Sequence, residues 1–244
     1  MTEVPTWRPP AGIAPRGTLI VLPGRGEHPL VYERFGRRLA QDGYVVHALG
    51  TTPQDTADHV RHAASRAAGE RATAPVVLVG SDTGALHALH AAAPHAGPFA
   101  VHGVVLAGAA PVNGPGTAGT DDWDAELDAR TACPTHRARL SEDAGFRRGQ
   151  LAAPVPDHLL TEDPRLGVPA LVLHGEDDPV TPVKEARERA ALLPGATLAV
   201  VRGGVHDVLN DASHRTAAAA LVLWLEGVRA DPDTARPLLT LIEA

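Results

Sequence analysis

Cysteine, methionine and lysine are nearly absent from the 244-residue sequence, with one residue of each. The single cysteine, Cys133, allows neither an intramolecular disulfide nor a cysteine metal cage, which fits a reducing cytoplasm. We interpret Cys133 as an ordinary small thiol. No apolar stretch reaches the ~20 residues that cross a bilayer, and residues 1–16, expected as an extended lead-in, lack the apolar core of a secretory signal. We therefore expect a soluble, cytoplasmic protein without a membrane span.

Basic residues are fewer than acidic ones: the sequence has 22 lysine and arginine residues and 29 aspartate and glutamate residues, which gives a net charge of −7. Without a basic stripe the chain is not expected to bind nucleic acid, and a small-molecule substrate is the expected partner. The length and the 44% of apolar residues suit a single domain with a sizeable core. The sequence leaves the oligomeric state open.

Six short apolar runs bounded by turn residues predict strands. They are apolar without alternation, which is typical of a mainly parallel sheet that is covered by helices on both faces. The predicted strands are 18–22, 44–49, 76–80, 101–107, 170–174 and 197–201. Helical patterns predict helices at 32–41, 52–68, 83–93, 123–130, 134–144, 182–193 and 211–228. The second of these is expected to begin with Thr52 as its N-cap and Pro53 at the first helical position.

The segment 112–167 interrupts this alternation, because it separates two predicted strands by far more than the usual few residues. We predict that it is a small lid, inserted into an α/β core made of residues 1–111 and 168–244. Its beginning, 113–120, has the composition of a flexible linker. The lid is expected to cover the carboxyl edge of the sheet, where open α/β folds bind ligands.

The strongest chemical signal is an apolar strand that runs into Gly80-Ser81-Asp82-Thr83-Gly84 and then into a helical pattern. Such a strand-to-helix turn is strained, and side chains at the flanking glycine positions would clash. The central residue of this elbow is the exposed nucleophile in enzymes that have it, which makes Asp82 the candidate nucleophile. Ser81, one residue earlier, would point away from the tip and is a weaker candidate.

Two later loops contain the groups that accompany such a nucleophile. The loop after the strand 170–174 offers Asp178, with Asp177 as the second choice, and the loop after the strand 197–201 offers His206. Nucleophile, acid and histidine thus follow the chain order typical of this elbow.

These motifs resemble those of the α/β-hydrolase fold, in particular its monoacylglycerol lipase and lysophospholipase-like branch, over nearly the whole chain apart from the lid. The resemblance also rests on the loop 23–28, on the acid loop 175–182 and on the histidine segment 206–211. It implies an α/β-hydrolase fold and an enzyme that needs no organic cofactor and no metal.

The resemblance further implies a catalytic triad of Asp82, His206 and Asp178, and an oxyanion hole formed by the backbone N–H groups of Arg25 and Thr83. Two positions depart from the pattern of the branch: Pro23 replaces a histidine, and Asp82 replaces the nucleophilic serine. In the predicted lid, we assign Trp123, His136 and Arg137 as candidate substrate-binding residues.

An aspartate at the elbow changes the expected chemistry. It is already an anion at neutral pH, so His206 is free to activate water. Attack on an ester carbonyl would form a high-energy anhydride, whereas attack on saturated carbon forms a plain ester. We therefore expect hydrolysis of an epoxide-, halide- or ester-type substrate through Asp82, although the usual lid tyrosines of epoxide hydrolases are missing.

Two other functions stay open. Asp82 and His206 would also suit a non-hydrolytic enzyme that moves protons, such as a cyclase or lyase. Alternatively, the change from serine to aspartate abolished catalysis and left a ligand-binding module.

The remaining polar residues near these motifs receive plainer interpretations. The histidine pairs 59/62 and 87/90 have helical spacing but no carboxylate that would complete a metal site. Asp207, Asn210 and Asp211 are interpreted as residues of an N-terminal capping turn.

Overall fold

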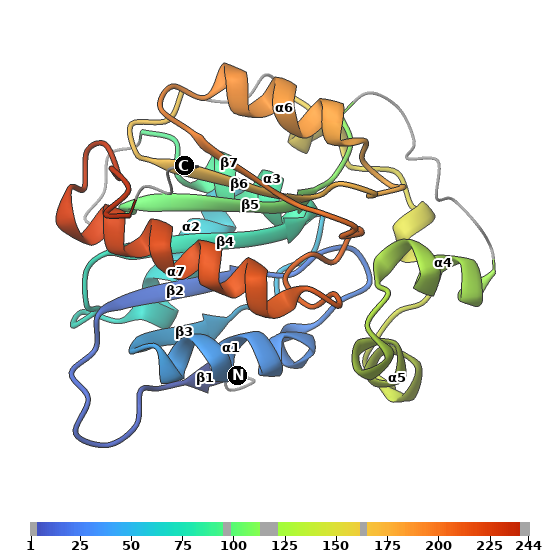
Figure 1. Ribbon diagram of the computed structural model, residues 1–244, viewed down its shortest axis with the longest axis horizontal. Coiled ribbons are helices and arrows are strands. Elements are labelled where there is room, and N and C mark those ends of the chain that lie inside the picture. The colour runs from blue at the N-terminus through green and yellow to red at the C-terminus, as the bar shows by residue number, and fades with distance from the viewer. Residues whose placement is uncertain (1–3, 95–98, 113–121, 162–164, 240–244) are drawn as a thin grey trace, which may run out of the picture.

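A computed structural model of the protein describes residues 4–94, 99–112, 122–161 and 165–239. Within these residues, one seven-stranded sheet has the order β1-β3-β2-β4-β5-β6-β7 (Figure 1). Neighbours from β2 to β7 pair in parallel, whereas β1 pairs antiparallel with β3 at the edge. The strands are β1 (Thr6–Trp7), β2 (Gly17–Leu22), β3 (Tyr44–Ala48), β4 (Val76–Asp82), β5 (Gly103–Ala109), β6 (Ala170–Gly175) and β7 (Thr197–Val201).

The unbroken apolar character of the strands follows from burial on both faces. In β4, Val77 and Val79 pack into one core cluster and Leu78 into another, because successive side chains point to opposite faces. Residues of α1 and α7 complete the first cluster, and residues of α2, α3 and α6 complete the second. The sheet is therefore the middle layer of three, and all six strands predicted from the sequence are confirmed.

Ten helical segments lie in the described residues. The α-helices are α1 (Glu33–Gln41), α2 (Ala57–Ala68), α3 (Thr83–Ala91), α4 (Trp123–Arg130), α5 (Pro134–Glu142), α6 (Val183–Leu192) and α7 (His214–Ala230). Short 3₁₀ helices are η1 (Pro29–Tyr32), η2 (Gln150–Ala152) and η3 (Asp157–Leu159). Together with the sheet they form the α/β-hydrolase fold expected from the motifs.

The predicted start of the second helix is wrong. The side chain of Thr56, not Thr52, accepts a hydrogen bond from the His59 N–H and caps α2. Thr52 instead donates its own backbone N–H to Asp55 Oδ2 at 2.7 Å, which forms a turn before the helix. Two good N-cap residues stand four positions apart, and the competing side-chain turn decides between them.

Helices α4 and α5 lie beside the end of the sheet toward which the parallel strands point (Figure 1). The backbone there is tied to the core, since Asp207 N–H donates to Arg130 O at 2.8 Å and Arg147 N–H donates to Gly26 O at 2.9 Å. The predicted linker 113–120 falls outside the described residues. Among the described helices, none is long and apolar enough to cross a membrane.

Candidate active site

Asp82 is the last residue of β4 and stands at a sharp turn into α3. Its φ of 51° and ψ of −120° are strained for a residue with a side chain. A Cβ on Gly80 would lie 2.0 Å from Gly84 O, and a Cβ on Gly84 would lie 2.0 Å from Leu22 O. The prediction that this elbow needs glycine on both sides is therefore confirmed.

The three predicted triad residues meet at the carboxyl edge of the sheet. His206 Nδ1 lies 2.9 Å from Asp178 Oδ2, and His206 Nε2 lies 3.3 Å from Asp82 Oδ1. Asp178 Oδ1 accepts the backbone N–H groups of Val180 and Thr181, which fixes the carboxylate. The imidazole thus stands between two carboxylates, one oriented by its own loop and one at the elbow.

Arg25 binds Asp82 with its side chain as well as its backbone. Its backbone N–H donates to Asp82 Oδ2 at 2.8 Å, and its Nε and Nη2 donate to Oδ2 and Oδ1, each at 2.8 Å. The other guanidinium nitrogen, Nη1, donates to the carbonyls of Leu151 and Ala153. The sequence predicted only the backbone contribution of Arg25, and the bidentate ion pair is an additional feature of the site.

These contacts set the charges of the site. Burial raises the pKa of Asp82, but Arg25 and His206 more than offset it and hold that pKa well below its usual range. Burial lowers the pKa of His206, but Asp178 and Asp82 outweigh it and raise that pKa to about 10. The resting site therefore holds an aspartate anion beside an imidazolium.

The site is closed in this conformation. Only 1% of Asp82, 1% of His206 and 4% of Arg25 is exposed. The carbonyls of Leu151 and Ala153, in and just after η2, cover the guanidinium. Asp82 is therefore shielded from solvent by Arg25 and this segment.

Thr83 is the first residue of α3 and is fully buried beside the elbow. Its hydroxyl has no hydrogen-bond partner among the described residues. Its backbone N–H lies at the positive end of the helix dipole, which favours a negative charge nearby. Its role as the second oxyanion donor stays a prediction.

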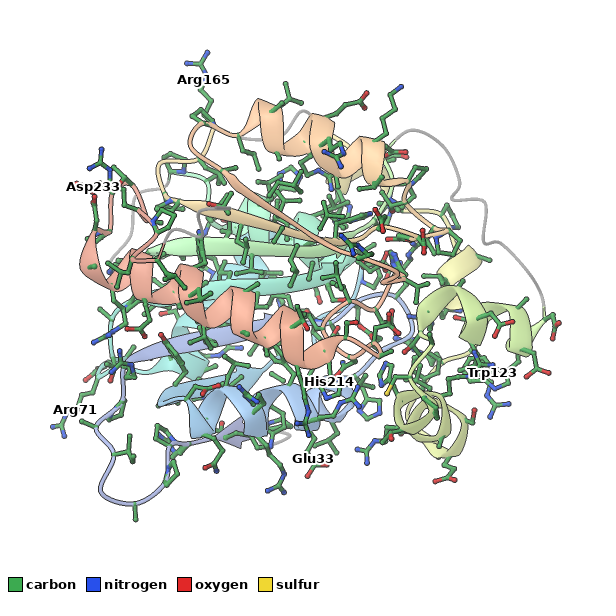
Figure 2. The ribbon with its side chains drawn as sticks, in the orientation of Figure 1. Glu33, Arg71, Trp123, Arg165, His214 and Asp233 are labelled. Atoms are coloured by element: carbon green, nitrogen blue, oxygen red, sulfur yellow. The ribbon has the colours of Figure 1, made fainter. Side chains whose placement is uncertain are left out.

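The three residues assigned to substrate binding are engaged elsewhere. Trp123 packs against Phe146 and under the guanidinium of Arg148, at the outer end of α4 (Figure 2). Arg137 pairs with Asp128 at 2.6 Å. His136 is buried and its Nε2 lies 3.2 Å from Asp207 Oδ2. The structure does not bring these side chains to Asp82, and their role in substrate binding stays a prediction.

A second buried network lies next to the triad. Arg130, fully buried, donates to Glu126 Oε1, to Asp207 Oδ1 and to the carbonyl of Arg25. Glu126 also accepts backbone N–H groups from Gly149 and Leu151. Arg130 thus links α4 to the loop that carries Arg25 and to the residue after His206.

The interpretation of 207–211 as a helix-capping turn is wrong. Helix α7 begins at His214, and Asp211 accepts hydrogen bonds from Thr131 Oγ1 and from the backbone N–H groups of Ala132 and Val205. The side chain of Asp207 binds Arg130 at the end of α4 and His136 in α5. These carboxylates hold the segment 130–136 against the core.

Glu27 stands at the inner edge of this network. Its Oε2 accepts the Gly24 N–H at 2.7 Å and the hydroxyl of Tyr32. Burial raises the pKa of Glu27 to about 7, and the nearby Asp207 adds to the shift. The side chain of Ser81 also interacts with the Tyr32 hydroxyl.

Comparisons with known proteins agree with the architecture. Residues 151–235, less than half of the chain, match the model of a family described as TAP-like protein. No curated protein matches the sequence.

Solved structures match over most of the chain. The monoacylglycerol lipase of Paleococcus ferrophilus has a TM-score of 0.67 and 19% identity, over 92% of this chain and 98% of that one. A soluble variant of the Saccharomyces cerevisiae monoglyceride lipase has a TM-score of 0.69 and 15% identity, over 91% and 90%. The enol-lactonase of Burkholderia xenovorans has a TM-score of 0.62 and 17% identity, over 90% and 94%. These likenesses show that the chain has the α/β-hydrolase fold.

Proposed function

We propose that this α/β-hydrolase-fold chain is a hydrolase of small organic molecules, which opens an epoxide by attack of Asp82 and then hydrolyses the resulting ester. The observation that carries the proposal is the position of the Asp82 carboxylate. One oxygen, Oδ2, accepts the Arg25 backbone N–H, and the other, Oδ1, faces His206 Nε2.

This division of the two oxygens suits covalent catalysis. If Oδ1 forms the bond to the substrate carbon, Oδ2 becomes the carbonyl oxygen of the new ester and already lies at an N–H donor of the predicted oxyanion hole. When water attacks the ester, negative charge develops on that same oxygen. A donor preorganised at such an oxygen contributes about 3 kcal/mol to stabilisation of the transition state.

The charged state of His206 selects among the possible leaving groups. With a pKa raised to about 10 by Asp178 and Asp82 against the effect of burial, it carries a proton at neutral pH. An opening epoxide needs a proton on its oxygen, whereas a departing halide does not. The two tyrosines are engaged elsewhere, Tyr32 with Glu27 and Tyr44 with Glu226. Arg25 Nη2 also lies at the attacking oxygen but does not release its proton, so His206 is the acid available there.

The protons balance over the cycle. In the first step the Asp82 Oδ1–carbon bond forms, the epoxide carbon–oxygen bond breaks, and His206 gives its proton to the alkoxide. Esterification removes the charge of Asp82, which lowers the pKa of His206 and keeps it neutral, ready to act as a base. In the second step His206 takes a proton from the attacking water. The tetrahedral intermediate collapses, and the proton of the new Asp82 carboxyl passes to the departing alkoxide.

Trapping the ester tests the proposal. We expect acid quenching of wild-type protein during its first turnover of a terminal epoxide such as styrene oxide to leave the mass of the epoxide on the peptide that contains Asp82. His206→Gln should form this adduct at least about 100-fold more slowly, since it lacks the acid. With a primary alkyl bromide, which needs no acid, the same variant should accumulate the adduct because water is no longer activated.

Asp82→Asn is the matched control and should form no adduct with either reagent. If the wild-type protein neither opens the epoxide nor reacts with the bromide, the proposal of covalent catalysis by Asp82 is contradicted. Bromide release by the wild type without epoxide opening would replace the epoxide by a halide substrate.

A second candidate function is a binding module without catalysis. The observation that favours it is the buried Arg25–Asp82 ion pair, in which the guanidinium binds both carboxylate oxygens. A proton-transfer enzyme would use the same Asp82–His206 pair without an ester. The adduct on Asp82 distinguishes both from the covalent hydrolase, because neither forms one.

A further inference from the structure

A buried cluster of three side chains joins α5 to the core beside the triad. Glu27 comes from the loop after β2, His136 from α5 and Asp207 from the loop after β7. Each offers an oxygen or nitrogen atom, and these atoms lie within 4.8 Å of one another. At most 8% of any of the three residues is exposed.

We propose that Glu27, His136 and Asp207 form a binding site for one divalent transition-metal ion such as Zn²⁺, which fastens α5 to the carboxyl edge of the sheet. Two carboxylates and one imidazole are ligands that Zn²⁺ takes in proteins. This proposal departs from the expectation of a metal-free protein and does not depend on the proposed reaction.

One polar atom in the cluster lacks a partner. Glu27 Oε1 is buried and makes no hydrogen bond within the described part of the chain, whereas Oε2 is bound by Gly24 and Tyr32. A buried carboxylate oxygen without a partner is costly, and a metal ion would satisfy it.

The spacing of the other two ligand atoms fits a shared ion. His136 Nε2 lies 3.2 Å from Asp207 Oδ2. Two ligand atoms that each lie about 2.0–2.1 Å from a tetrahedral zinc ion are about 3.3 Å apart. The His136 and Asp207 atoms thus already have the spacing of two ligands of one ion, and a Glu27 oxygen lies within 4.8 Å of both.

The local charge also calls for a cation. Three buried carboxyl groups, those of Glu27, Glu126 and Asp207, lie around the guanidinium of Arg130, which pairs with Glu126 and Asp207. A divalent ion would offset the charge of these carboxylates, with His136 bound in its neutral form.

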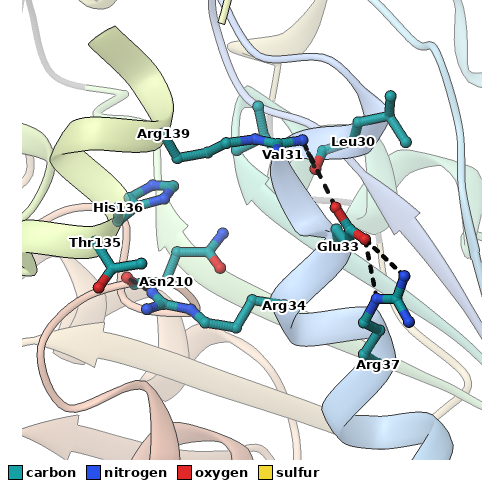
Figure 3. Close-up of a pocket in the computed structure, with 9 residues that line it drawn as sticks. All are labelled: Leu30, Val31, Glu33, Arg34, Arg37, Thr135, His136, Arg139 and Asn210. Carbon is teal, nitrogen blue, oxygen red and sulfur yellow. Dashed lines mark hydrogen bonds and ion pairs between the residues drawn. The ribbon is translucent and has the colours of Figure 1, made fainter. Parts of the chain in front are cut away.

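A pocket lies next to the cluster. A pocket of about 390 Å³ opens between α1 and α5, and His136 stands in its wall with Asn210 and Arg34 nearby (Figure 3). His136 faces the pocket on one side and Asp207 on the other. Asn210 Oδ1, buried in the same wall, has no partner among the described residues.

Metal binding to purified protein tests the proposal. After removal of metals with EDTA and dialysis, we expect calorimetric titration with ZnCl₂ to show one equivalent bound, and Co²⁺ to give a visible absorption band. Replacing a direct ligand should cost more than the roughly 10–100-fold lost with an outer partner. His136→Gln should therefore bind Zn²⁺ at least about 100-fold more weakly.

Two further variants keep the test decisive. His62→Gln removes an exposed histidine of α2 and should leave the affinity unchanged. Glu27→Gln should keep or raise the metal-free Tm, because the buried charge is gone, yet lose the rise in Tm that Zn²⁺ gives the wild type. No binding by the wild type, or equal affinity in His136→Gln, overturns the proposal. Loss of binding in His62→Gln instead would identify an adventitious surface site.

Discussion

Replacing Arg25 by methionine is expected to lower the free energy of unfolding by about 3–5 kcal/mol, the cost of removing one partner of a buried ion pair. Asp82 would keep its charge with 1% exposure, and the carbonyls of Leu151 and Ala153 would lose their donor. Denaturant unfolding measures the loss. Arg37→Met, which removes an exposed partner of Glu33, is the control and should change stability by no more than about 0.5 kcal/mol.

The origin of this loss can be separated from lost packing. If the unpaired carboxylate causes it, the double variant of Arg25→Met and Asp82→Asn should lose clearly less than the sum of the two single variants. The pKa of Asp82 is depressed in the folded state, so its ion pair stabilises the fold above the unfolded pKa of about 3.9 and less as the pH falls. The gap between wild type and Arg25→Met should therefore narrow below about pH 4. A loss under about 1 kcal/mol, or a gap independent of pH, contradicts this account.

Replacing Asp82 by asparagine is expected to lower kcat for epoxide opening at least about 10⁴-fold, because an amide neither attacks carbon nor carries the charge that pairs with His206. The matched control is Asp177→Asn, which changes an exposed carboxylate next to Asp178 and should keep activity within about twofold. Circular dichroism checks that the variants are folded at the assay temperature.

A companion variant, Asp82→Ser, asks whether the predicted oxyanion hole accepts an ordinary ester. Serine at the elbow would regain a hydroxyl nucleophile, and His206 without its Asp82 partner would have a lower pKa and act as a base. Activity on short p-nitrophenyl esters is the expected result. Full epoxide activity in Asp82→Asn would remove Asp82 from the mechanism.

The sequence predicted the order of strands and helices well because every central strand is covered on both faces and stands out as an apolar run. It missed β1, which has only two residues at the edge of the sheet. It also misplaced the start of α2, since both Thr52 and Thr56 suit an N-cap and only the Asp55 turn decides between them. Local patterns predict an element more reliably than they predict its first residue.

The meeting of Asp82, Asp178 and His206 was predictable because Asp82 ends a strand at a recognisable turn and the other two lie in recognisable loops that follow strands. The contact of the Arg25 side chain with Asp82 was not predicted, because the two residues are 57 positions apart in the sequence. A signal was present, since an arginine in the loop expected to face the elbow has the charge opposite to that of the aspartate. The burial of Arg130 was harder to predict, because its helix has the sequence pattern of an exposed one. Its partners Asp207 and Arg25 lie 77 and 105 positions away. Contacts of this kind depend on tertiary packing, which spacing within a sequence does not encode.

The covalent role of Asp82 is tested most directly by single-turnover hydrolysis of a terminal epoxide with excess protein in oxygen-18 water. Water that attacks the ester carbonyl leaves its oxygen in the carboxylate, so the peptide containing Asp82 should gain one oxygen-18 atom while the first diol formed carries none. Label in the diol and none in Asp82 would mean that water attacks the epoxide itself, which contradicts the covalent mechanism.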